Sequence, residues 1–234
     1  MLVAHAPDLW STEYELAWQG GAIPIPVRMT VIRLGDGQLV LHSPAPLSPE
    51  LRRELDALGR VGFLVIPWAH GVYAEAAARA YPEAQLLAAP KAPARRKALA
   101  FHGSLADDPP AAWAGRIETH LLRGFRLNEV VLFHRPSRTL VITDLCFNVQ
   151  RASSRAARLF FRANGMWRRF GPSRLIRLLV PSNRAELRRS IEQVLAWDFE
   201  RIVPGHGDVL EHGGPAALRA AWLGRPAGPA RVTA

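Results

Sequence analysis

Three predicted strands of this sequence are each followed by a side chain that could bind a metal ion. The strands are short apolar runs at residues 63–66, 139–143 and 201–203. The side chains that follow them are His70, Asp144 and His206. In α/β sheets, ligands bind outside the carboxyl ends of strands, where segments far apart in sequence meet. Imidazole and carboxylate groups gathered there are the ligands that zinc, iron or manganese takes.

The turn around His206 is the most specific of these signals. Its sequence is Gly205-His206-Gly207-Asp208, and flanking glycines let a backbone bring an imidazole close to a ligand. The other two residues also have ordinary structural explanations, because a histidine after a strand can be hydrogen-bonded in the core and an aspartate can cap a helix. From the residues alone, both interpretations stay open.

Three further polar residues lie near these strands. Glu129 opens a predicted strand beside the same edge; it could act as an acid or base, or form an ion pair with one of the many arginines. Asp208 and His134 are candidates to orient an imidazole through a hydrogen bond. Cys146, two residues beyond Asp144, needs no role other than that of a small buried side chain.

Alternating strand and helix signals position these residues. A hairpin is predicted from residues 27–34 and 38–42 around Gly35-Asp36-Gly37, whereas the first 26 residues look irregular. Further strands are predicted at 84–88, 116–122 and 129–134, and helices at 49–58, 73–81, 94–100, 150–164, 173–180, 184–197 and 215–222. The strands are too many for a simple doubly wound sheet. This favours a mixed sheet, or two sheets flanked by helices.

Length and composition fit one domain. The chain has 234 residues, of which 49% are hydrophobic, and one cysteine, so a disordered chain and a disulfide scaffold are both excluded. Acidic residues interrupt the first apolar stretch, and no apolar stretch is long enough to span a membrane. We therefore expect a cytoplasmic protein with a single domain over residues 1–223 and a flexible C-terminal tail at 224–234.

The positive charge is concentrated in one mostly helical segment, residues 148–197. Eleven arginines and a single acid lie between Arg151 and Ser190, and this part accounts for the net charge of +10. Four arginines share one face of the first predicted helix: Arg151, Arg155, Arg158 and Arg162.

Three interpretations of this arginine face are open. The helices could pack on the domain and leave the arginines in solvent. They could form an anion-binding lid over the predicted metal edge, with phosphate oxygens, including those of a nucleic-acid backbone, as partners. They could also bind an acidic membrane surface, as basic amphipathic helices with aromatic residues do. No sequence-reading motif accompanies the arginines, so specific nucleic-acid recognition is not predicted.

Two stretches of the chain resemble the metallo-β-lactamase-fold hydrolases. Ile202–Asp208 is similar to their last metal-binding motif, and Arg138–Asp144 resembles the strand and bridging aspartate that precede it. The wider pattern is similar to a branch of unknown function in that superfamily, the DUF4336 domain proteins. The stretches that match this branch are 28–34, 129–134 with 137–140, and 197–199. The resemblance, over residues 10–222, implies an α/β fold: an αββα sandwich with its site at one edge between the sheets and a basic helical insertion.

The chain departs from the superfamily's usual ligand set. The His-x-His-x-Asp-His motif expected after the strand at 63–66 is reduced to His70. The histidine of the third motif falls near Phe125, and the acidic residue expected after the second strand falls near His42 or Ser43. Together with the position of these residues after three predicted strands, the resemblance implies a single divalent ion (zinc, iron or manganese) with three ligands: His70, Asp144 and His206.

These expectations give two hypotheses for function. In the first, the protein is a metal-dependent hydrolase with a reduced ligand set; Asp144 and His206 are catalytic, and the arginines hold a small anionic or phosphate-bearing substrate. In the second, the fold has lost its metal, and the Arg-rich segment binds an anionic partner, either nucleic acid or a membrane surface. The metal content of the protein distinguishes the two hypotheses.

Overall fold

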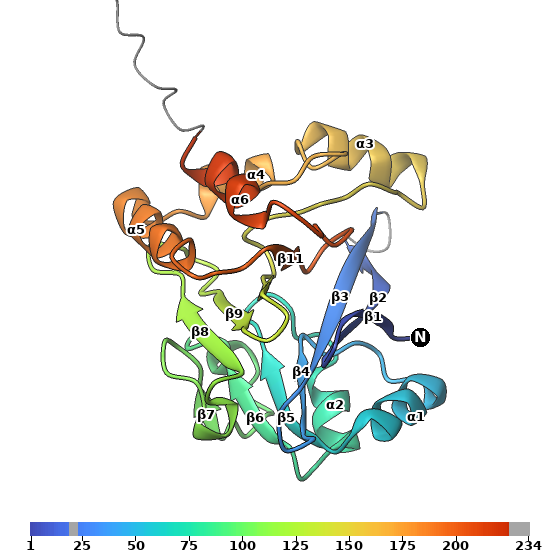
Figure 1. Ribbon diagram of the computed structural model, residues 1–234. Helices are drawn as coiled ribbons and strands as arrows, with labels where there is room; N and C mark the ends of the chain where they lie inside the picture. The colour runs from blue at the N-terminus through green and yellow to red at the C-terminus, as the bar shows by residue number, and fades with distance from the viewer. Residues whose placement is uncertain (19–22, 225–234) are drawn as a thin grey trace, which may run out of the picture.

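The computed structural model describes residues 1–18 and 23–224. These residues form two β-sheets that stack face to face, with helices on the outer faces (Figure 1). The predicted αββα sandwich is confirmed. Within the described residues, no helix is long and apolar enough to cross a membrane.

The first sheet has seven strands in the described residues, ordered as in the sequence. They are β1 (Val3–Ala6), β2 (Leu9–Trp18), β3 (Ile23–Arg33), β4 (Leu39–His42), β5 (Val61–Ile66), β6 (Gln85–Ala88) and β7 (Gly103–Ser104). Neighbouring strands from β1 to β4 are antiparallel, and those from β4 to β7 are parallel. The parallel strands need crossovers, and α1 (Pro49–Leu58) and α2 (Ala74–Ala80) provide two of them.

The second sheet has four strands in the described residues, in the order β11-β10-β9-β8. Their bounds are β8 (Ile117–Leu121), β9 (Val130–His134), β10 (Thr139–Val141) and β11 (Arg201–Val203). The pair β10–β11 is parallel and the other two pairs are antiparallel. The helices that follow β10 and β11 are α3 (Arg155–Ala163), α4 (Arg174–Leu179), α5 (Arg184–Val194) and α6 (Gly214–Trp222).

Successive apolar residues of a strand point to opposite faces of its sheet and so pack in different layers. In β3, Val31 packs with the helices outside the first sheet, whereas Ile32 packs in the core between the sheets. In β9, Val131 packs with α5 and α6 outside the second sheet, whereas Leu132 faces the first sheet. Strands that are apolar on both faces therefore lie between two cores. Each large apolar side chain buried there contributes about 1.5–3 kcal/mol to the stability of the fold.

The prediction that the first 26 residues are irregular is wrong, because β1, β2 and the start of β3 lie there. Proline is tolerated in this part of β3 because β4 pairs only with residues 30–33, so the opposite side of the strand is open. Pro24 and Pro26 are two residues apart, so their backbone nitrogens, which have no hydrogen to donate, both face this open side. The carbonyl of Pro26 is used by the site described below.

One other prediction needs correction. The predicted helix at 94–100 is only a short 3-10 turn, Pro93–Arg95, because the backbone leaves helical geometry at Arg96, with φ −134° and ψ 61°. The Arg96 guanidinium donates to the carbonyls of Gly71 and Trp68 at 3.2 and 3.3 Å. Within the segment 148–197, α5 belongs to the outer layer of the second sheet, while α3 and α4 extend over the site edge. Of the predicted tail at 224–234, residues 225–234 lie outside the described residues.

Candidate metal centre

The structure brings the three candidate ligands together at one edge of the sandwich. His70 follows β5, Asp144 follows β10 and His206 follows β11. The Nε2 atoms of His70 and His206 lie 3.0 Å apart. Asp144 places one carboxylate oxygen 3.5 Å from His70 Nε2 and the other 3.4 Å from His206 Nε2. All three side chains are buried.

The loop after β11 fixes the orientation of His206. Its Nδ1 lies 2.7 Å from the carbonyl oxygen of Pro26, which can only accept a hydrogen bond, so Nδ1 has the proton and Nε2 of the neutral ring has a lone pair. Phe147 stacks on the imidazole with ring centroids 4.8 Å apart. The backbone N–H of Arg28 also donates to Gly205 at 2.9 Å, so β3 holds this loop at two points.

Neighbouring atoms lie so close to Gly205 and Gly207 that a side chain would not fit at either position. A Cβ on Gly205 would lie 2.8 Å from Cε1 of His70, and a Cβ on Gly207 would lie 2.3 Å from the carbonyl oxygen of Asn148. Gly207 also has a φ of +82°, a conformation that favours glycine. The turn therefore packs directly against the loop of His70 and against the segment after Asp144.

A serine orients His70. The Oγ of Ser43, at the end of β4, lies 3.2 Å from Nδ1 of His70, which directs Nε2 towards His206 and Asp144. Ser43 is near the position where the resemblance places an acidic residue. Its neighbour His42 is buried, and burial, with the charge of His70, lowers the pKa of His42 to about 3. This ring is therefore neutral at pH 7.

A buried carboxylate holds the backbone that presents Asp144. Glu129 accepts hydrogen bonds from the backbone N–H groups of Thr143 at 2.7 Å and Asp144 at 3.0 Å. Burial, together with the charge of Asp144, raises the pKa of Glu129 to about 8. Burial opposes ionisation of Asp144 as well, but the charges and hydrogen bonds of His70 and His206 outweigh it and hold the Asp144 pKa well below its usual range.

This arrangement fits one divalent metal ion. Two ligand atoms each about 2 Å from a tetrahedral ion lie about 3.3 Å from each other. The two Nε2 atoms are 3.0 Å apart, each lies 3.5 or 3.4 Å from a different oxygen of Asp144, and one ligand atom from each residue can be chosen so that all lie within 4.8 Å of one another. The second nitrogen of each imidazole is held by an oxygen, from Pro26 and Ser43, as in known metal-binding histidines. Among the described residues, this trio is the one group of three or more such side chains close enough to share an ion.

An apolar pocket leads to the trio. Its volume is about 270 Å³, and His70, Asp144 and His206 are among its lining residues. Most of the others are apolar, and they include Leu16 of β2, Ile25 of β3, Phe161 of α3, and Leu175 and Ile176 of α4. No arginine or lysine lines the pocket within the described residues. A ligand at the trio would therefore have mainly hydrocarbon around it.

The structure does not bring the other predicted orienting residues to the imidazoles. His134 pairs with Thr139 at the start of β10, whereas Asp144 follows the other end of that strand; the Nδ1 of His134 lies 2.7 Å from Ser137 Oγ. Asp208 instead accepts a hydrogen bond from Arg151 at 2.8 Å. Pro26 and Ser43, rather than His134 and Asp208, orient the two imidazoles. Glu129 does lie at the site, where it binds backbone rather than an arginine.

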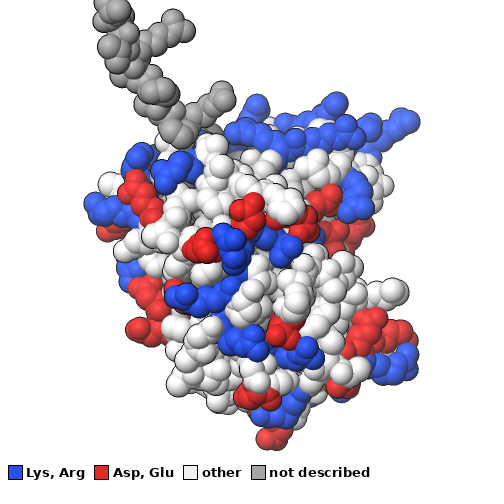
Figure 2. All heavy atoms as spheres, viewed as in Figure 1, with Lys and Arg blue, Asp and Glu red and all other residues white. Residues whose placement is uncertain are grey.

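The arginine face points away from the trio. Arg155, Arg158 and Arg162 are exposed on α3, whose opposite face packs through Ala157 and Phe161. Figure 2 shows basic side chains along the upper edge of the molecule, over α3. Because these arginines do not line the pocket, the expectation that Arg151, Arg155, Arg158 and Arg162 hold a substrate anion over the metal edge is not supported.

Comparison with known proteins agrees with this fold. A family model described as a domain of unknown function (DUF4336) matches residues 8–169. No curated protein matches the sequence.

Several solved structures share the fold. A metallo-β-lactamase from Pontibacter korlensis has a TM-score of 0.64 and 13% identity over 96% of this chain and 97% of that one. For a metallo-β-lactamase from Hirschia baltica the TM-score is 0.64, with 12% identity over 97% and 98% of the two chains. For the rubredoxin:oxygen oxidoreductase of Desulfovibrio gigas it is 0.65, with 12% identity over 95% of this chain and 61% of that one. The chain therefore has the fold of these metallo-β-lactamases and belongs to the DUF4336 family.

Proposed function

We propose that this protein is a metal-dependent hydrolase that binds one divalent ion through His70, Asp144 and His206. The observation that supports this function is the convergence of two imidazoles and a carboxylate, with ligand atoms within 4.8 Å of one another, at the end of an apolar pocket. When bound, zinc, iron or manganese would act as a Lewis acid and lower the pKa of a bound water to about 7.

The chain's own residues prepare this site. Pro26 and Ser43 hold the outer nitrogens of His206 and His70, so both rings offer Nε2 to the same point. The Asp144 carboxylate supplies the negative charge that a divalent ion needs, and its low pKa keeps it ionised at neutral pH. Phe147, stacked on His206, shields one side of that imidazole from bulk water.

The pocket indicates a substrate with an apolar group. Among the described residues its lining offers hydrocarbon from Leu16, Ile25 and Phe161 and no arginine or lysine, so an anionic group placed there, away from the metal ion, would lose its hydration without a compensating charge. An acyl chain or ring would instead gain about 25 cal/mol for each Å² removed from water. We therefore place the apolar part of the substrate in the pocket and its scissile bond beside the trio.

Elemental analysis tests the metal site. We would measure zinc, iron and manganese in untagged protein, comparing wild type with Asp144→Ala, His206→Ala and a control, His212→Ala, whose side chain is 86% exposed. The proposal predicts about one ion per chain in wild type and control, and a loss of it in both site variants. Wild-type protein without metal after reconstitution would contradict the proposal and favour a non-catalytic binding module.

A substrate series tests the pocket. We would compare hydrolysis of p-nitrophenyl esters with acyl chains from acetyl to decanoyl by the metal-loaded protein. The proposal predicts that kcat/KM rises with chain length, because longer chains bury more apolar surface, and that Asp144→Ala removes the activity. A rate that is independent of chain length would contradict the assignment of the apolar group to the pocket.

A further inference from the structure

The two helices beside the pocket expose apolar side chains. We call the exposed side chains of residues 155–179, on α3, α4 and the loop between them, the α3–α4 surface. Seven large apolar side chains are exposed in the described part of the chain, and four of them lie on this surface. They are Leu159, Leu178, Leu179 and Leu175, with exposures of 69%, 67%, 66% and 45%. Such a cluster marks an interaction site.

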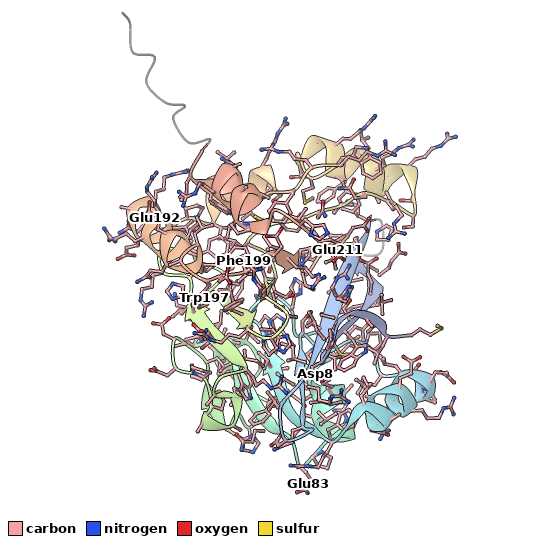
Figure 3. The ribbon with its side chains drawn as sticks, viewed as in Figure 1. Asp8, Glu83, Glu192, Trp197, Phe199 and Glu211 are labelled. Carbon is pink, nitrogen blue, oxygen red and sulfur yellow. The ribbon has the colours of Figure 1, made fainter. Side chains whose placement is uncertain are left out.

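The same surface is strongly basic. No aspartate or glutamate occurs between Asp144 and Glu186. Six arginines are exposed on the surface: Arg155, Arg158, Arg162, Arg168, Arg169 and Arg174. Within residues 1–18 and 23–224, none of these six forms an ion pair with an acidic side chain. Figure 3 shows nitrogen-tipped side chains extending from α3 away from the body of the molecule. The surface thus offers free positive charge to a partner.

We infer that the α3–α4 surface docks on an anionic lipid bilayer. Leucines interspersed with unpaired arginines suit the boundary between acyl chains and headgroups, because the leucines enter the apolar layer while the guanidinium groups bind phosphate oxygens. Each arginine near an anionic leaflet strengthens binding about fivefold. A nucleic-acid backbone would use the arginines but would leave the four leucines in water.

The aromatic residues of this segment agree with a bilayer rather than a nucleic acid. Single-stranded nucleic acids stack their bases on exposed aromatic rings. Here Phe161 is buried, and Phe160, Trp167 and Phe170 are half-buried. Phe160, Phe161 and Trp167 pack in the core beneath α3, and Phe170 packs against the helices of the second sheet. The exposed apolar groups of the surface are aliphatic.

The pocket mouth connects this surface with the trio. Leu175 is half exposed and lines the pocket, and so does Val72, which is 59% exposed on the loop after His70. An apolar molecule could therefore pass from a bilayer into the pocket without crossing bulk water. The docking inference rests on the surface itself and does not depend on a metal or on hydrolysis.

Vesicle flotation tests the inference. Full-length protein would be mixed with vesicles of phosphatidylcholine alone, or of phosphatidylcholine with about 30% phosphatidylglycerol, in low and high salt. We expect binding to the anionic vesicles only, weakened by salt. Leu178→Ser with Leu179→Ser should weaken this binding about tenfold, and Arg158→Gln with Arg162→Gln at least about tenfold. Both pairs are exposed, so folding should be unaffected.

A matched control changes arginines elsewhere. Arg52→Gln with Arg53→Gln, on α1 at the opposite end of the molecule in Figure 1, should leave vesicle binding unchanged. A parallel titration with a single-stranded oligonucleotide addresses the other partner. Absence of binding to anionic vesicles would overturn the inference. Oligonucleotide binding that depends on Arg158 and Arg162 but not on the leucines, without vesicle binding, would assign the surface to nucleic acid.

Discussion

The Glu129 carboxylate accepts a hydrogen bond from the backbone N–H of Asp144 at 3.0 Å, and its second oxygen accepts one from Thr143 at 2.7 Å. The two residues come from neighbouring strands of the second sheet, since Glu129 precedes β9 and Asp144 follows β10. The backbone turn that presents a candidate ligand is thus fixed by a side chain rather than by the sheet ladder. This makes Glu129 a positioning residue.

Replacing Glu129 with glutamine tests this relationship. Above the Glu129 pKa of about 8 both carboxylate oxygens are acceptors, whereas glutamine replaces one of them with an NH2 group that can only donate. At that pH one backbone N–H therefore loses its partner in the variant. An unpaired buried N–H costs about 1–3 kcal/mol; we expect the free energy of unfolding in urea to fall by that amount, and the ion to bind more weakly. Glu192→Gln, in an exposed ion pair on α5, is the control. Equal stability of Glu129→Gln and wild type would contradict the role.

The sequence predicts the three candidate ligands better than the groups that orient them. His70, Asp144 and His206 each follow a recognisable strand, and strand ends meet at one edge of a sheet. Nothing local shows that His206 would donate to Pro26, which is 180 residues away. The Pro-x-Pro pattern at 24–26 could have indicated a strand with one open side, but prolines more often indicate irregular structure.

The arginine face illustrates a second limit. Helical periodicity shows that Arg155, Arg158 and Arg162 share a face, and the structure agrees. It does not show which way that face points. The direction depends on Ala157 and Phe161, which bury against β3 and the segment after Asp144, so the arginines point outwards and hydrocarbon lines the pocket.

Gly205→Ala should reduce metal binding while the fold is retained. The added Cβ would lie 2.8 Å from Cε1 of His70 and 3.0 Å from the Cα of Thr143, so the imidazole must move away from its partners. We expect the dissociation constant for zinc, measured by chelator competition, to rise at least about tenfold. Gly35→Ala is the control, because its Cβ would meet only the Arg116 side chain at 3.4 Å. Unchanged zinc affinity of Gly205→Ala would show that His70 is not a ligand.

Leu175→Trp should narrow the pocket mouth. The side chain is half exposed at the rim, so the larger ring can be accommodated without disturbing the core. We expect affinity for an apolar probe such as a decanoyl ester to fall by about tenfold, with unchanged metal content. Leu178→Trp, on the same helix but outside the pocket lining, should bind the probe like wild type. If both variants lost affinity equally, the pocket would not be the binding site.

The buried His134 should make the protein less stable in acid. Burial, and next the charge of Arg116, lowers its pKa from 6.5 to about 4, and its Nε2 has no hydrogen-bond partner in the structure. Between pH 6.5 and 4 the unfolded chain binds a proton that the folded chain refuses, so stability falls as pH falls, by up to about 3 kcal/mol. His134→Gln should remove this part of the pH dependence in urea unfolding, whereas His212→Gln, at an exposed position, should keep it. If the stability of His134→Gln and of wild type changed with pH in the same way, His134 would not be the source of this acid sensitivity.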